Sequence, residues 1–155
     1  MLKEIIQLIK WLFSSNPSDC DELQIVQMKH FPFSGYSAMS WCGRLVTRKD
    51  PSTISEITKN HETIHLKQAQ ADGSWVKYYF KYLKEWTKGC IIMTSVSSAY
   101  YTIYYEMEAY ANEEDFSYVK NYDIKNIEKY KIKNRKETYK KFVSVREWKK
   151  YIKTL

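Results

Sequence analysis

The chain of 155 residues has few residues that cross-link a fold or interrupt helices and strands: it has three cysteines, three prolines and four glycines. Cys20, Cys42 and Cys90 are scattered, odd in number and without a C-x-x-C pair. They therefore predict no disulfide framework, and they lack the spacing of a zinc site. We interpret them as free thiols, which fits a cytoplasmic protein in a reducing compartment.

Long apolar runs are also missing. The uncharged residues 89–105 are rich in Ser, Thr and Tyr, which makes them a poor transmembrane candidate. Charged residues interrupt Met1–Phe13, and no small-residue cleavage site follows, so a signal peptide is not predicted. We interpret residues 1–15 as an amphipathic helix packed on the domain, with membrane-surface docking as the less favoured alternative. Its expected apolar face consists of Leu2, Ile5, Ile6, Ile9, Leu12 and Phe13.

No internal repeat or low-complexity segment is visible, and the length fits a single domain, residues 1–155, able to bury a core. The patterns predict an α+β fold that is predominantly helical, with a small antiparallel sheet. Strands are expected at 23–28 and, as one or two strands, at 37–48; helices are expected at 52–72, 75–86 and 104–113.

The net charge of +7 is concentrated at one end of the chain. Residues 120–155 contain thirteen Lys or Arg and four Asp or Glu, a local charge of +9, interleaved with aromatic residues. Such a basic segment could make weak contact with an anionic membrane surface or with nucleic acid. We favour a structural interpretation, in which a helical segment packs its aromatics on the domain and exposes its lysines, because no specific nucleic-acid-binding signature accompanies the charge.

Only three histidines occur, and two of them belong to the sequence His61-Glu62-Thr63-Ile64-His65. This H-E-x-x-H pattern places two imidazoles four residues apart on one face of a helix, where they can bind one metal ion. Its flanks are typical of a helix, because Ser52 or Ser55 can cap the start and Gly73 can end it. A solvated helix face that carries two histidines by chance is the alternative.

A catalytic zinc ion needs a third protein ligand, and no further histidine follows His65. The best candidate is Glu106, in a segment that is expected to be helical. Glu108 is the alternative, and at 3.6 residues per turn it points about 160° away from Glu106. One of these two carboxylates is therefore expected to face the metal.

These residues resemble the gluzincins, zinc metallopeptidases with H-E-x-x-H and a downstream glutamate. The segment Glu106–Tyr110 is similar to the E-x-x-A-D glutamate helix of the CAAX-protease-like members, with Tyr110 in place of the Asp. Three blocks also resemble short bacterial proteins of minimal gluzincin type: H-F-P-F-x-G-Y-x-A-M at 30–39, N-H-E-x-I-H at 60–65 and E-x-E-A-Y-A-N-E at 106–113.

The resemblance implies a zincin-like domain and a zinc-dependent hydrolase that cleaves peptides or proteins. His61, His65 and Glu106 would hold Zn²⁺, and Glu62 would be the general base. By analogy, residues Gly43–Thr47 would form the sheet edge that binds substrate. Candidates for stabilising the oxyanion are His30, Tyr100, Tyr101, Tyr104, Tyr105 and Tyr110.

Two other functions stay open at this level. The protein could be a catalytically inactive zinc-binding or interaction domain of the same fold. It could also be a basic module that associates with membranes or nucleic acid, in which H-E-x-x-H is incidental.

Overall fold

The computed structural model describes residues 1–36, 38–93 and 95–155. It divides into two compact units, Met1–Tyr78 and Tyr79–Leu155, and the boundary falls inside helix α3 (Trp75–Met93). Helices predominate, and a three-stranded sheet lies in the first unit, which confirms the expectation of a mainly helical α+β chain.

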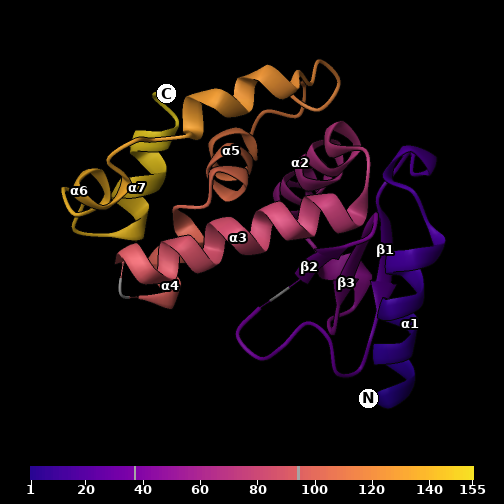
Figure 1. Ribbon diagram of the computed structural model, residues 1–155. Coiled ribbons are helices and arrows are strands. Elements are labelled where there is room, and N and C mark those ends of the chain that lie inside the picture. Colours follow the sequence, from indigo (N-terminus) through magenta and orange to yellow (C-terminus); the bar gives the residue numbers. More distant parts are fainter. Residues whose placement is uncertain (37, 94) are drawn as a thin grey trace. The chain divides into compact units, whose positions relative to one another are not determined.

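The sheet of the first unit has the strand order β1-β3-β2 (Figure 1). Strand β3 (Arg44–Thr47) pairs antiparallel with β2 (Ala38–Trp41) and parallel with β1 (Gln24–Gln27). The predicted antiparallel sheet is therefore wrong in part, because the sheet is mixed. Of the predicted strand region 37–48, Ser37 lies outside the described residues.

A two-residue turn joins β2 to β3. Cys42 and Gly43 both have positive φ, 49° and 75°, as two-residue hairpins require for strands with a right-handed twist. This tight turn returns the chain into the sheet between β1 and β2. The expectation that Gly43–Thr47 forms the substrate-binding edge is consequently wrong, since β3 is the central strand and the edges are β1 and β2.

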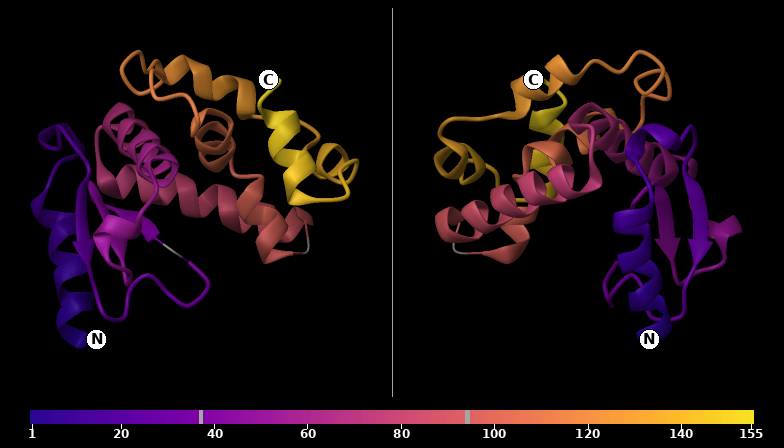
Figure 2. Two further views of the ribbon diagram at one scale, coloured as in Figure 1. Left: turned by 180° about the vertical axis from the view of Figure 1, so that it is seen from behind. Right: turned by 45° about the vertical axis from the view of Figure 1, so that its right-hand side comes forward.

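Helix α1 (Leu2–Ser14) packs on this sheet (Figure 2). Leu8 is buried with Met28, Phe31 and Val46, and the Trp41 indole N–H donates to the carbonyl of Leu8 at 2.9 Å. The predicted amphipathic helix is confirmed, but its buried face is displaced round the helix. Ile5, Leu8 and Trp11 contact the sheet, whereas Leu2, Ile6, Ile9 and Phe13 are exposed.

Helix α2 (Glu56–Asp72) follows a short 3-10 turn, η2 (Pro51–Thr53), and contacts the edge strand β2. The Ser55 hydroxyl accepts a hydrogen bond from the Thr58 backbone N–H at 3.1 Å, which caps the helix start. Gly73 ends it with φ of 76°, in the left-handed conformation that suits glycine. The predicted helix and both of its boundary signals are thus confirmed, with Ser55 rather than Ser52 as the cap.

In the second unit, α4 (Val96–Tyr101), α5 (Tyr104–Asn112), η3 (Ile124–Tyr130), α6 (Arg135–Tyr139) and α7 (Val145–Ile152) follow α3. Helix α5 contacts η3 and α7, and Met107 is buried with Trp148 and Ile152. The aromatic residues of the basic segment join this core, as the structural interpretation predicts: Tyr130, Tyr139, Phe142, Trp148 and Tyr151.

In the described part of the chain, no helix combines the length and the apolar character that crossing a membrane requires.

The hairpin turn generates a stability prediction. A Cβ at Gly43 would lie 2.5 Å from the Cys20 sulfur, and φ of 75° is itself unfavourable for a side chain. We expect Gly43→Ala to lower the free energy of unfolding by about 2 kcal/mol or more, measured by denaturant titration. Gly35→Ala is the control, because φ is also positive there but nothing lies within 4 Å of the added Cβ. Equal losses in both variants would show that the Cys20 contact contributes nothing.

Candidate metal centre

His61 and His65 lie one turn apart on α2, well inside its 17 residues. Their ring centroids are 4.9 Å apart, with 79° between the ring planes. Both side chains are buried, at 7% and 5% exposure. Because the helix is capped at both ends and has no internal Pro or Gly, it holds the two imidazoles in a fixed relation.

The buried face of α2 is unusually polar. Burying a polar or charged group costs free energy unless it finds partners, so an ordinary structural helix buries apolar residues instead. Here six polar residues are buried together: Asn60, His61, Glu62, His65, Gln68 and Asp72. Such a face is typical of a functional site, and it does not fit the alternative of a solvated helix face.

His65 is oriented by side chains of its own unit. Its Nδ1 lies 2.7 Å from the Gln68 side-chain oxygen and 3.2 Å from the Tyr78 hydroxyl. Because the amide oxygen can only accept, Nδ1 carries the proton, and Nε2 presents its lone pair. Partners of this kind fix the tautomer of histidines that bind metals. Neither residue is among the positions predicted from the sequence, although Gln68 is three positions after His65 and so on the same helix face.

Glu106 lies in the first turn of α5 and is 3% exposed. Its Oε1 accepts a hydrogen bond from the Tyr82 hydroxyl at 2.6 Å. The start of a helix favours a carboxylate, and the hydroxyl donor fixes its orientation. No sequence signal links Tyr82 to Glu106, because the two residues lie on different helices 24 positions apart.

Glu108 is fully buried but has a different partner. Its Oε1 accepts from the Tyr118 hydroxyl at 2.7 Å. The two acids of α5 therefore occupy separate environments, in agreement with their expected angular separation on the helix.

The charge of Glu106 affects the pKa values of two of the candidate tyrosines. Burial raises the pKa of Tyr100 and of Tyr110, and the nearby Glu106 carboxylate raises both further. Their hydroxyl oxygens are 3.5 Å apart. Both hydroxyls therefore stay protonated at neutral pH and can donate hydrogen bonds.

The other candidates for an oxyanion donor are also packed against neighbouring side chains. Tyr101 and Tyr104 pack, as Tyr110 does, against the core of the second unit, and Tyr105 stacks on Tyr82. His30 has its Nδ1 2.7 Å from a Glu4 carboxylate oxygen, so α1 holds this ring.

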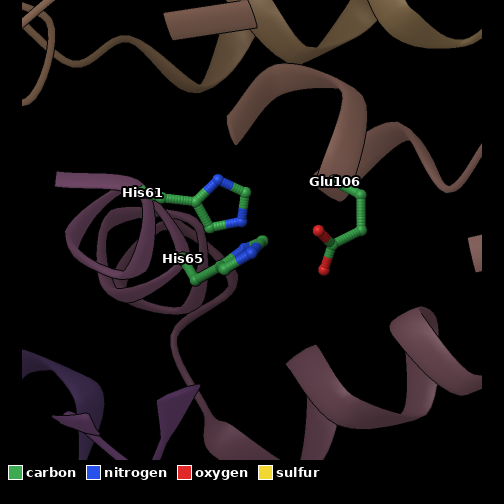
Figure 3. A group of neighbouring side chains, drawn as sticks. All are labelled: His61, His65 and Glu106. Atoms are coloured by element: carbon green, nitrogen blue, oxygen red, sulfur yellow. The ribbon is translucent and has the colours of Figure 1, made fainter. Parts of the chain in front are cut away.

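His61, His65 and Glu106 form a group that could hold a metal ion. One ligand atom from each, an imidazole nitrogen or a carboxylate oxygen, lies within 4.8 Å of the other two. Figure 3 shows both imidazoles and the carboxylate directed toward one another. In a tetrahedral zinc site with bonds of about 2.1 Å, ligand atoms are about 3.4 Å apart. Two nitrogens and one carboxylate oxygen are the donor set of many catalytic zinc ions, so the residues fit zinc.

The three cysteines do not belong to this group, and each is a free thiol. The chain matches no family model, no curated protein and no solved structure. The likeness to gluzincins therefore stays a prediction from three short sequence blocks, and the chemistry has to be inferred from the donors themselves: a buried His₂Glu set beside an acid, Glu62, on the same helix as the histidines.

Proposed function

We propose that the protein is a zinc-dependent metallopeptidase of gluzincin type. His61, His65 and Glu106 would hold the ion, and Glu62 would be the general base. The observation that supports this most is the buried group of two imidazoles and one carboxylate within 4.8 Å. The hydrogen bonds that His65 donates to Gln68 and that Tyr82 donates to Glu106 add to it, because they orient the side chains that would bind the metal.

A bound zinc ion would supply Lewis acidity, which polarises a carbonyl and lowers the pKa of water toward about 7. The chain would supply the proton transfers. Glu62 directly follows His61 on α2 and is itself buried, at 9% exposure. Its carboxylate would accept the proton of the attacking water and deliver it to the leaving amine.

The tyrosine pair on the second unit would assist the same step. Tyr100 and Tyr110 keep their protons and lie within the field of Glu106. Either hydroxyl could donate a hydrogen bond to the oxygen that becomes negative during attack on the carbonyl.

The sheet supports a peptide as substrate. Strand β2 is an edge strand and contacts α2, the helix that carries the histidines. An extended peptide that adds a strand to β2 would run beside α2 and gain main-chain hydrogen bonds independent of its sequence. This assignment replaces the earlier expectation of a substrate edge at Gly43–Thr47.

The metal content tests the ligand set directly. We expect about one zinc ion per wild-type chain by elemental analysis, and strong loss of zinc in His61→Ala and Glu106→Ala, because each removes one of three ligands. His30→Ala is the matched control, since His30 pairs with Glu4 and is not in the group. A well-folded wild-type protein that takes up no zinc would refute the ligand assignment.

The role of Glu62 is tested by Glu62→Gln. We expect this variant to keep its zinc and to lose about 10²–10⁴-fold in the rate of peptide hydrolysis, because an amide cannot accept the proton. Glu56→Gln, at an exposed acid in the first turn of the same helix, should leave the rate unchanged. Undiminished hydrolysis by Glu62→Gln would exclude Glu62 as the base. A zinc-loaded wild type that cleaves no member of a peptide library would instead favour the inactive zinc-binding domain.

The orientation of His65 gives a further prediction. Gln68→Ala removes the main acceptor at Nδ1, and we expect zinc affinity to fall about 10–100-fold in competition with a chromophoric chelator. Gln68→Glu, which restores an acceptor, should recover most of the affinity. Gln70→Ala is the control on the same helix, because the Gln70 amide donates to the carbonyls of Pro17 and Cys20. If Gln70→Ala weakens zinc binding as much as Gln68→Ala, the loss reflects the helix as a whole.

A further inference from the structure

The second unit has an open pocket of about 560 Å³, and most of its lining comes from residues 130–137, between the end of η3 and the start of α6. Its lining includes five cationic side chains: Lys88, Lys131, Lys133, Arg135 and Lys136. Only two carboxylates, Glu85 and Glu137, line it as well, so the pocket has an excess of three positive charges. We call it the basic pocket. Like charges gathered round one hollow repel each other, and an anion in the hollow would relieve that repulsion.

The Arg135 side chain is held in a defined position at the basic pocket. Its side chain is buried, at 9% exposure, although arginine is rarely buried to that degree. Nη1 donates to the Thr102 carbonyl at 2.8 Å and lies 3.3 Å from a Glu85 oxygen. These contacts hold the planar guanidinium in place, and its five N–H donors suit a phosphate or carboxylate group.

The lysines of the pocket differ in how far they are neutralised. Lys131 forms an ion pair with Glu128, and Lys88 lies 3.9 Å from Glu85. Among the described residues, Lys133 and Lys136 form no ion pair. Their charges are therefore available to a ligand, and they come from the same short segment as Arg135.

The size and the remaining lining point to a small molecule. A volume of about 560 Å³ falls within the range for small-ligand sites, about 300–1,000 Å³. Ile92, Ile132 and Tyr104 add apolar surface to the cations. A phosphate group carries up to two negative charges and three acceptor oxygens, so it can use the arginine and both lysines together, whereas a carboxylate has two oxygens and one charge.

We propose that the basic pocket binds a phosphate-bearing small molecule, with Arg135, Lys133 and Lys136 on its phosphate oxygens. The site belongs to the second unit alone and uses no residue of the candidate metal centre. It also refines the interpretation of the basic segment, because part of the segment's charge lies around one open pocket.

The test is isothermal titration of the full chain with pyrophosphate. We expect the double variant Lys133→Glu/Lys136→Glu to bind at least about tenfold more weakly than wild type, since two charge-assisted contacts become repulsive. Lys140→Glu/Lys141→Glu is the matched control: it makes the same change in net charge at two exposed lysines that do not line the pocket, and its affinity should stay within about twofold of wild type. Arg135 is left intact because its contact with Thr102 supports the fold.

Two further measurements decide where the ligand binds. Zinc also attracts phosphate oxygens, so the titration is repeated with His61→Ala, which should bind pyrophosphate as wild type does. Loss of binding in His61→Ala would assign it to the metal centre and overturn the proposal. Equal weakening by the two double variants would indicate diffuse attraction of anions, as for an oligonucleotide or a membrane surface, and would also overturn it, as would the absence of any binding by wild type.

Discussion

The polar buried face of α2 is the constraint on which the candidate site depends. An unsatisfied buried polar group costs about 1–3 kcal/mol, so a helix that buries six polar residues survives only if their partners are provided. Some of these partners are close in the sequence, since Gln68 and Tyr78 both contact Nδ1 of His65. The caps at Ser55 and Gly73 then keep the helix regular through the turn that holds the histidines. The stability of α2 and the readiness of its imidazoles for a metal therefore have the same physical origin.

The elements that the sequence predicted well are those with local signals. Ser55 and Gly73 lie at the ends of α2 as capping rules require, and the spacing of Glu106 and Glu108 correctly implied separate surroundings on α5. Features that depend on distant pairing were not predictable in this way. The order β1-β3-β2 arises because the hairpin at Cys42 and Gly43 inserts β3 between two strands, and no local pattern encodes that choice. The role of Tyr82 was not predictable either, because Glu106, which accepts its hydrogen bond, is 24 residues away in the sequence.

The basic segment, residues 120–155, contributes aromatic side chains to the core of the second unit and lysines to its surface. Its aromatic side chains supply the core of the second unit, where Trp148 packs near Met107 and donates to the Tyr101 carbonyl at 2.7 Å. Apolar burial of this kind fixes the backbone, and the intervening lysines are then held at defined positions instead of on a mobile tail. The net charge alone cannot distinguish a packed segment from a mobile tail, because both would have the same net charge.

The two buried acids of α5 act on different neighbouring side chains. Both accept one hydrogen bond from a tyrosine, at 2.6 Å for Glu106 and 2.7 Å for Glu108. Beyond the effect of burial, the charge of Glu106 raises the pKa of Tyr100 and Tyr110, and the charge of Glu108 raises the pKa of Tyr118 and Tyr130. Lys149 also lies near Glu106: burial lowers the pKa of this lysine, and the Glu106 charge opposes that shift. Burial keeps Tyr100 and Tyr110 protonated and works against the charge on Lys149, so the surroundings of Glu106 combine donors with a cation whose charge is costly to bury. Hydroxyl donors and a cation are partners that suit a carboxylate, and a carboxylate is the form in which a glutamate binds a metal.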